Sequence, residues 1–233
     1  MPDPGSAIVY YLVFLFSVTV HEAAHAWVAL IGGDPTAYHG GQVTLDPRPH
    51  IKREPMGMLW IPLISVALSG WPIGFASAPY DPDWARRHPK RAAWMALAGP
   101  GANLVLLLLA FVAIRIGAAT GVFYAPDSVG FDRLASSNAG EFWTGLAFIL
   151  SVVLSLNLLL LVLNLFPVPP LDGSGAVPLL LSDRATVRYQ EFLWNNRGLA
   201  LLGIFIAWNL FQYAFDPAFL FVLNLLYPGL GYH

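Results

Sequence analysis

Long apolar stretches dominate this chain and alternate with shorter segments that are polar or rich in Gly and Pro. A transmembrane helix needs about 20 mostly apolar residues. Four stretches meet this requirement and predict membrane-spanning helices over residues 6–31, 92–118, 142–166 and 198–215. A further apolar stretch, 218–227, is too short for an upright crossing. We expect it to form a half-span or to lie at the membrane interface.

Two segments between the first and second predicted spans depart from this pattern. Residues 37–51 contain a short β-like run around Gln42 to Leu45, bounded by Gly and Pro. Residues 57–79 are apolar but contain three prolines and two internal glycines: Pro62, Pro72, Pro79, Gly70 and Gly74. Proline inside a helix removes a hydrogen bond and clashes with the preceding turn. The second segment is therefore either a poor span or a re-entrant segment.

The composition agrees with a membrane protein. Hydrophobic residues make up 57% of the 233 residues and charged residues only 11%, whereas soluble domains carry about 25% charged residues. We therefore expect one integral membrane domain, residues 1–233, embedded in a lipid bilayer. The net charge of −2 gives no reason to expect a nucleic-acid partner. Without cysteines, the chain has no disulfides and no thiolate metal site, so a soft metal would need His and carboxylate ligands.

The first residues, Met-Pro-Asp-Pro-Gly, contain no Lys or Arg, whereas a cleaved signal peptide has a positive amino-terminal region. We therefore expect residues 6–31 to remain as a span. Ten of the twelve Lys and Arg residues share one side of the membrane if residues 57–79 make no net crossing. They are Arg48, Lys52, Arg53, Arg86, Arg87, Lys90, Arg91, Arg184, Arg188 and Arg197. Positive residues favour the cytoplasmic side, so this distribution favours re-entry and places the end of the first span in the cytoplasmic half.

The first predicted span contains the most polar motif of the chain, His21, Glu22 and His25. Residues four apart lie on the same face of a helix, so both imidazoles can bind one metal ion. The pattern is H-E-x-x-H, in which two His bind zinc and Glu is the general base. The alternative is an accidental match or a structural role. Titratable residues inside a span are costly and usually functional, which favours the zinc site.

A catalytic zinc site usually has three protein ligands and one open position. The candidates for the third ligand are His39, Asp46, His50, Glu54, His88 and Asp172. Most of them lie in polar or Pro-rich segments, where a solvated role is the simpler interpretation. Asp172 instead follows a long apolar helix in "NLFPVPPLDGSG", where prolines force non-helical backbone at membrane depth. Such backbone is tolerated only where it is buried or lines a cavity. Asp172 can meet the histidines only if the ends of the first and third spans share one side.

Two asparagines are further candidates. Asn164 lies near the end of the same helix and either donates a hydrogen bond to a developing oxyanion or satisfies nearby backbone groups. Asn103 lies early in the second span, in "LAGPGANLV", and we expect it to form hydrogen bonds between helices.

Three separated motifs, HEAAH, LAGPGAN and NLFPVPPLDG, resemble the site-2 proteases, which are zinc intramembrane metalloproteases. The resemblance covers residues 10–195, and "GGQVTLDPRPHI" is similar to the β-hairpin region of small members. It implies one Zn²⁺ per chain, bound by His21, His25 and Asp172, with Glu22 as base and Asn164 assisting substrate or oxyanion binding. We expect no PDZ or CBS module within these 233 residues, because the motifs and predicted spans leave no room for one. The chain also reads Gly-Ser-Gly after Asp172, where members commonly read Gly-Gly-Arg.

The expected fold is therefore an all-α polytopic membrane protein: a helical bundle with a short membrane-associated β-hairpin and a re-entrant segment. The expected activity is hydrolysis of peptide bonds in or near the transmembrane helix of single-span membrane-protein substrates. It would take place in the cell membrane, with the active site towards the cytoplasmic side. The strand within residues 37–51 either pairs with an unwound substrate or only shields the site.

Three other functions are weaker alternatives. A catalytically silent scaffold of the same fold would be expected to lack Glu22 or a ligand, and all are present. A metal transporter would have titratable groups spread along a path, whereas here they cluster at one depth. A prenyl-protein protease usually takes its third ligand from a Glu on a later helix, and the Pro-Pro-Leu-Asp-Gly segment argues against it.

Overall fold

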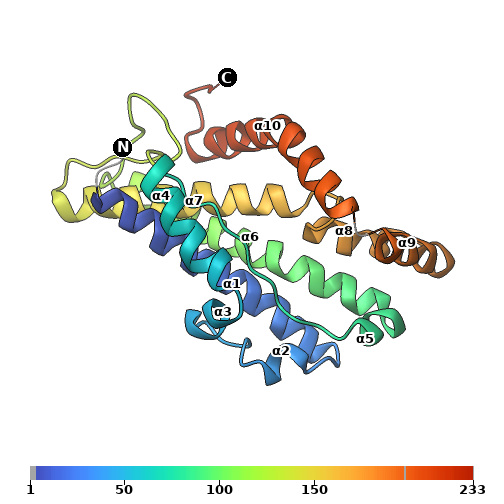
Figure 1. Ribbon diagram of the computed structural model, residues 1–233. Helices are drawn as coiled ribbons and strands as arrows, with labels where there is room; N and C mark the ends of the chain where they lie inside the picture. Colours follow the sequence, from blue (N-terminus) through green and yellow to red (C-terminus); the bar gives the residue numbers. More distant parts are fainter. Residues whose placement is uncertain (1–3, 197, 233) are drawn as a thin grey trace.

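The computed structural model describes residues 4–196 and 198–232, which form a mostly helical bundle (Figure 1). Within these described ranges, four helices are long and apolar enough to cross a membrane: α1 (Pro4–Ile31), α6 (Pro89–Ala119), α7 (Glu141–Asn164) and α10 (Leu199–Leu226). They confirm the prediction of a polytopic helical protein. Short helices connect them: α2 (Thr36–His39), α3 (Pro47–Arg53), the π-helix η1 (Met56–Trp60), α4 (Ile61–Ser69), α5 (Pro82–Arg87), α8 (Asp172–Ala176), the 3₁₀ helix η2 (Val177–Leu180) and α9 (Asp183–Asn195).

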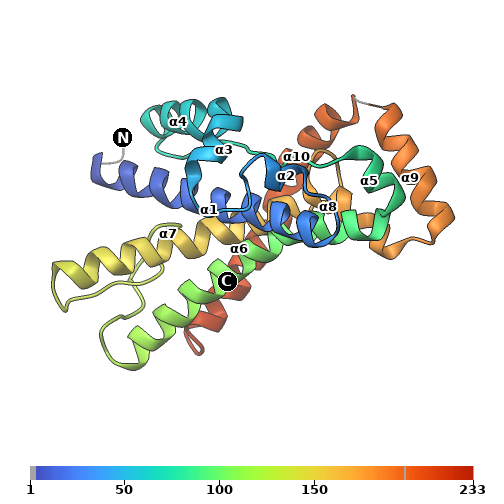
Figure 2. The same cartoon turned by 90° about the horizontal axis from the view of Figure 1, so that it is seen from below.

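Helix α6 packs against both α1 and α7 and forms the centre of the bundle. Figure 2 shows α1, α6 and α7 close together at the end near α8 and spread apart at the other end. One apolar core fills the space between α1, α7 and η1, around Phe14, Met58 and Leu156. A second core joins α6 and α7 to the end of α10, around Ile114 and Leu226. The converging end therefore brings the polar motifs of α1 and α6 together.

The predicted span 198–215 and half-span 218–227 form one helix, α10, so their separation at Pro217 was wrong. Proline has no N–H group, so the usual helical bond to the carbonyl of Tyr213 cannot form. Membrane helices tolerate such a residue when the helix bends and its surroundings compensate. Figure 1 shows α10 bent along its length.

The predicted β-hairpin within residues 37–51 is also wrong, since no sheet occurs in the part of the chain that the structure describes. The segment instead contains α2, a loop and the start of α3. Asp46 begins α3, because its carboxylate accepts a hydrogen bond from the backbone N–H of Arg48 at 3.0 Å, and Pro47 occupies the first helical position. Gly41 turns the loop with a φ of +72°. The short β-like run therefore has no second strand with which to pair.

Residues 56–69 form η1 and α4. The chain reverses its direction at Gly70 and returns as an extended segment that ends at residue 79. The two arms touch, because the N–H of Phe75 donates to the carbonyl of Gly57 at 3.1 Å. A Cβ added at Gly57 would lie 2.0 Å from the Phe75 carbonyl oxygen, so only glycine permits this approach. The Ser77 hydroxyl donates to Glu54 at 2.7 Å, so the segment ends beside the point where it began. This is the path that a re-entrant segment requires, and re-entry into the membrane stays a prediction.

Hydrogen bonds draw together several segments that carry the positive residues. Arg53 donates to the carbonyl of Ser77 at 3.1 Å, and Lys90 donates to the carbonyls of Pro178 and Leu181 at 2.5 and 2.6 Å. The first turn of α6 and the segment after α8 are therefore neighbours. Arg197, and residues 1–3 on which the argument about a signal peptide partly rests, lie outside the described residues.

Single cysteines provide a test of the re-entrant path, because the chain contains none of its own. Lys52→Cys and Asp83→Cys flank the segment and are exposed. We expect an impermeant maleimide to label both from the same side of sealed vesicles. Asn138→Cys, in the exposed loop between α6 and α7, is the control and should be labelled from the other side. Labelling of Lys52→Cys and Asp83→Cys from opposite sides would mean that the segment crosses the membrane.

Candidate metal centre

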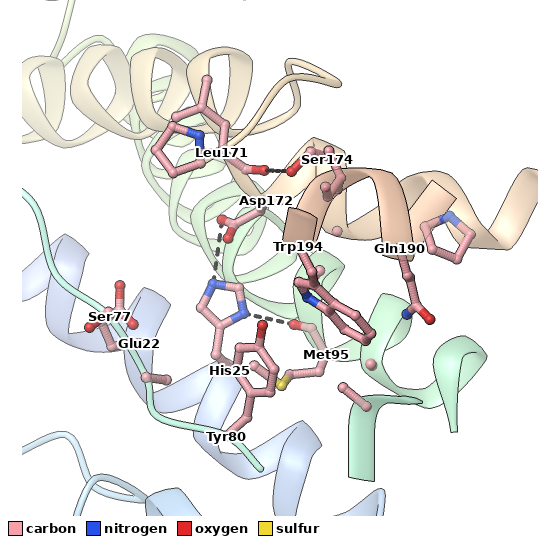
Figure 3. A pocket seen from close by; sticks show the side chains of 18 of the residues that line it. Glu22, His25, Ser77, Tyr80, Met95, Leu171, Asp172, Ser174, Gln190 and Trp194 are labelled. Carbon is pink, nitrogen blue, oxygen red and sulfur yellow. Dashed lines mark hydrogen bonds and ion pairs between the residues drawn. The ribbon is translucent and has the colours of Figure 1, made fainter. Parts of the chain in front are cut away.

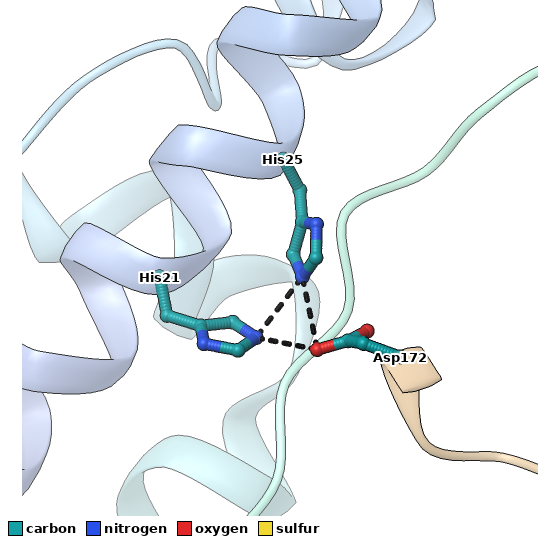
Figure 4. A group of neighbouring side chains, drawn as sticks. All are labelled: His21, His25 and Asp172. Carbon is teal, nitrogen blue, oxygen red and sulfur yellow. Dashed lines mark hydrogen bonds and ion pairs between the residues drawn. The ribbon is translucent and has the colours of Figure 1, made fainter. Parts of the chain in front are cut away.

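His21, His25 and Asp172 meet at one point, although Asp172 lies far from the two histidines in the sequence (Figure 4). The Nε2 atoms of the two histidines lie 3.0 Å apart. The Oδ2 atom of Asp172 lies 3.0 Å from Nε2 of His21 and 3.4 Å from Nε2 of His25. Both histidines are buried, and Asp172 is half-buried. The structure therefore brings together the three residues that the sequence predicted as ligands.

Asp172 reaches this point because the segment after α7 folds back against the bundle. Helix α7 ends at Asn164, and α8 begins at Asp172 itself. Gly173 packs against the end of α7, where a Cβ would lie 2.4 Å from the carbonyl oxygens of Leu165 and Phe166. On the other side, Gly203 of α10 packs against the Pro169 carbonyl. The backbone that carries Asp172 is thus held between α7 and α10.

A backbone carbonyl orients the imidazole of His25. Its Nδ1 atom lies 2.7 Å from the carbonyl oxygen of Met95 on α6. A carbonyl only accepts hydrogen bonds, so Nδ1 carries the proton and donates it. The Nε2 atom of the neutral ring therefore presents a lone pair towards Asp172.

A chain of buried amides orients the imidazole of His21 in the same way. The Nδ2 group of Asn157 on α7 donates to the carbonyl of Val153 at 2.8 Å, which turns its Oδ1 atom towards Asn103. Asn103 donates to that oxygen at 2.8 Å and presents its own Oδ1 atom to Nδ1 of His21 at 2.6 Å. Nδ1 of His21 must then be the donor, and its Nε2 atom also carries a lone pair. The partner of a ligating His commonly fixes its tautomer in this way.

These hydrogen bonds confirm the prediction that Asn103 bonds between helices, since Asn103 connects α6 to α1 and α7. Sequence analysis did not identify Asn157, which is fully buried in the middle of the third span. The signal was available, because an amide inside an apolar span needs a polar partner.

Three acceptor atoms thus converge, two imidazole lone pairs and one carboxylate oxygen. They repel one another unless a cation lies between them. Two His and one carboxylate are a common donor set for catalytic zinc. Ligand distances of about 2.0–2.1 Å around a tetrahedral zinc ion separate the ligand atoms by about 3.3–3.4 Å. The observed separations of 3.0 to 3.4 Å fit one zinc ion held by His21, His25 and Asp172.

Gly99 of α6 leaves space at the centre of this group. A Cβ added at Gly99 would lie 2.3 Å from Nε2 of His25 and 2.4 Å from Nε2 of His21. Any side chain at this position would therefore occupy the point at which the three ligands converge.

Glu22 lies beside the ligands and faces a pocket of about 310 Å³. Its side chain is buried, and its Oε2 atom has no hydrogen-bond partner among the described residues. Figure 3 shows Glu22, His25 and Asp172 around the pocket, with Ser77 and Tyr80 from the extended arm and Trp194 from α9. Helix α9 is fixed nearby, because Tyr189 donates to the Ser174 carbonyl at 2.9 Å and Arg86 lies 4.4 Å over the Trp194 ring. Burial raises the pKa of Tyr189, which keeps this donor protonated.

The other predicted candidates for the third ligand have different surroundings. A hydrogen bond from Arg48 lowers the pKa of Asp46, and the two form an exposed ion pair. Glu54 accepts a hydrogen bond from Ser77, and Nε2 of His50 lies 3.1 Å from the Thr44 carbonyl. His39 and His88 lie beside the rings of Tyr38 and Trp84.

Asn164 occupies the last turn of α7, where it is half-buried. Among the described residues, those that line the pocket do not include Asn164. Its predicted role in oxyanion binding stays a prediction.

Comparison with known proteins agrees with this chemistry. The profile of Peptidase family M50 matches residues 9–205. The "Putative zinc metalloprotease YwhC" of Bacillus subtilis is 35% identical over 173 residues, which cover 73% of this chain and 68% of that protein. The "Putative zinc metalloprotease Rip2" of Mycobacterium tuberculosis is 34% identical over 165 residues, 70% of this chain and 54% of that protein. Its counterpart in Mycolicibacterium smegmatis is 34% identical over 175 residues, 74% of this chain and 57% of that protein. No solved structure gives a significant match.

The space at Gly99 allows a direct test of the metal site. Gly99→Ala places a methyl group among the three ligand atoms, so we expect zinc binding to be lost. Gly101→Ala is the matched control, because a Cβ at Gly101 meets no atom within 4 Å. Zinc content after purification, measured by mass spectrometry, distinguishes the two variants. Equal zinc content in both would contradict the proposed position of the ion.

The amide chain predicts the effect of changes at Asn157. Asn157→Leu removes the acceptor for Asn103 and should weaken zinc binding by about 10–100-fold, as loss of such outer partners does. Asn157→Asp still accepts from Asn103 in either protonation state, so most of the affinity should remain. Competition with a chromogenic chelator measures both affinities. Ser151→Ala is a control, because Ser151 is buried on the same helix but bonds to Leu134 and Ala135. If Asn157→Leu binds zinc as tightly as this control, the hydrogen-bonded amides of Asn157 and Asn103 do not orient His21.

Proposed function

The chain belongs to Peptidase family M50, and from this premise we propose that it is an intramembrane zinc endopeptidase. Its substrates are single-span membrane proteins, cut in or near their transmembrane helix. Regulated intramembrane proteolysis is the setting in which such an activity would act. The wider family and the named relatives support a zinc metalloprotease. The matched part of this chain spans about half the length of the mycobacterial relatives.

The observation that carries the proposal is the position of Glu22. Its side chain is buried, its Oε2 atom lacks a hydrogen-bond partner among the described residues, and it lines the pocket beside His25 and Asp172. Burying a carboxylate oxygen without a hydrogen-bond partner costs folding free energy. Its position beside the ligands is therefore better explained by a function than by stability. A silent scaffold or a transporter gives no reason for this carboxylate beside the ligands.

The residues of the pocket suggest how a peptide bond is held and cut. Zinc, when bound, acts as a Lewis acid towards the peptide carbonyl and makes water more acidic. Glu22 accepts a proton from the attacking water as its oxygen bonds to the carbonyl carbon. As the C–N bond breaks, Glu22 gives that proton to the leaving amine nitrogen. Asn103 and Met95 hold the imidazoles in position throughout.

The substrate must unwind, because a helix hides its peptide bonds in internal hydrogen bonds. We place the unwound segment along residues 76–80. This part of the chain is extended and lines the pocket. No backbone partner is recorded for the N–H groups of Ala76 and Ala78, so an extended peptide can pair with this edge.

Two further elements of the proposal rest on sequence. We place the active site towards the cytoplasmic side of the cell membrane, because most Lys and Arg residues fall in segments on that side of the predicted topology. We also retain Asn164 as a residue that assists binding of the substrate or the oxyanion, for which its amide is a suitable donor.

Glu22→Gln separates catalysis from metal binding. We expect this variant to keep one zinc ion per chain and to lose at least about 100-fold of the cleavage rate, because the amide cannot accept the proton. The assay is cleavage of a panel of single-span model substrates by purified protein in vesicles, with and without a chelator. Cleavage by Glu22→Gln at the wild-type rate, or chelator-resistant cleavage by the wild type, would exclude the mechanism.

A further inference from the structure

Helix α10 is the least enclosed of the four candidate spans. Only 11% of its apolar window is buried, compared with 33–50% for the other three. In its first half, the buried residues Gly203 and Ala207 mark the side that faces the protein. Figure 1 shows α10 at the edge of the bundle. The opposite side of this half is therefore available to the membrane or to a partner.

That outward side carries several polar residues among apolar ones. Asn209, Gln212, Tyr213 and Asp216 are all exposed, with Tyr213 at 72%. At about 100° per residue, Asn209, Gln212 and Asp216 lie on the side of the helix opposite Gly203 and Ala207, and Tyr213 lies on the flank beside them. They stand within a helix whose other exposed residues include Phe205 and Trp208, as expected for a span.

These polar groups have almost no partners within the described residues. The Asn209 amide donates only to the carbonyl of Phe205 in its own helix, at 2.8 Å, and no partner is recorded for the Gln212 or Asp216 side chains. Pro217 also leaves the Tyr213 carbonyl without its usual N–H donor. Polar groups that face hydrocarbon are costly, and in membrane proteins they usually face other protein groups.

The spacing of the outward residues is that of a coiled coil. Leu202, Phe205, Asn209, Gln212 and Asp216 follow one another at intervals of three, four, three and four residues. This is the repeat by which two helices pack along a shared seam. In parallel pairs, an Asn at such a position bonds to its counterpart and fixes the register. We call these five residues the α10 seam.

We propose that the α10 seam joins two copies of this chain in the membrane, side by side about a two-fold axis along the membrane normal. A second copy is the partner that the chemistry favours, because the amides of Asn209 and Gln212 both donate and accept and are therefore self-complementary. It also carries the same groups at the same depth. The hydroxyl of Tyr213 is a donor suited to the carboxylate of Asp216. Hydrogen bonds between Asn or Gln side chains are a known cause of association between membrane helices.

The seam also has a connection to the metal site. Gly203, on the inner side of α10, packs against the Pro169 carbonyl in the segment that leads to Asp172. The seam and this contact thus lie on opposite sides of α10. Association of two copies would hold α10 against the backbone that positions the third ligand.

Cysteine crosslinking tests the seam without background, since the chain has no cysteine. Phe205→Cys lies on the seam and leaves its polar residues intact. Leu210→Cys is the matched control, because Leu210 is adjacent to Asn209 and 49% exposed but points about 100° away from it. Each purified variant is reconstituted in vesicles at a low protein-to-lipid ratio and oxidised with copper phenanthroline. Zinc content confirms that each variant is folded.

We expect Phe205→Cys to give mainly crosslinked dimer and Leu210→Cys only a low background. Adding Asn209→Leu and Gln212→Leu to Phe205→Cys should weaken dimerisation by about tenfold, as expected for the loss of polar contacts between helices. Equal crosslinking at positions 205 and 210 would indicate random collision and overturn the proposal. So would an uncrosslinked Phe205→Cys, or dimerisation that does not change when both amides are removed.

Discussion

The structure depends on holding three mutually repelling acceptor atoms together in a largely apolar interior. Two imidazole lone pairs and a carboxylate oxygen meet within 3.4 Å. With both imidazoles neutral, these three atoms repel one another unless a cation lies between them. The surrounding helices therefore have to supply the restraint: the carbonyl of Met95 orients one ring, and the amides of Asn103 and Asn157 orient the other. The carbonyl of Met95 and the Oδ1 atom of Asn103 each accept from the Nδ1 atom of a histidine, so both Nε2 atoms can bind the metal ion.

Close approach of backbones is the second requirement of this site. Gly99 allows α6 to lie directly against both ligand rings, and Gly173 allows the Asp172 segment to lie on the end of α7. Gly203 brings α10 onto the same segment from the other side. A methyl group at any of these three positions would overlap its neighbour, so the site is assembled by helix backbones as much as by side chains. Packing of this kind leaves the ligands little freedom to reorganise.

The polar residues within the spans have two kinds of surroundings. Asn103 and Asn157 point inward, and both the oxygen and the nitrogen of each amide form hydrogen bonds. Asn209, Gln212 and Asp216 point outward, and among the described residues only Asn209 has a hydrogen bond, to the Phe205 carbonyl of its own helix. The same cost of an unpaired polar group in hydrocarbon explains both cases. Inside the bundle, the buried amides are paired with each other and with a ligand of the metal site. On α10, the outward polar groups are proposed to pair with those of a second copy.

The features that the sequence by itself determined are local or depend on composition. The length of the apolar runs predicted the four spans, and the four-residue spacing of His21 and His25 placed both on one face. Asp172 was also predictable, because prolines prevent its segment from being helical and a carboxylate at membrane depth needs a partner. Only the tertiary structure decided the remaining features. Asn157 joins the site through contacts between three helices, α10 continues through Pro217 because its surroundings permit a bend, and residues 37–51 form no hairpin. A strand needs a partner, and a buried amide needs an acceptor at the right distance, so both outcomes depend on how distant parts of the chain pack.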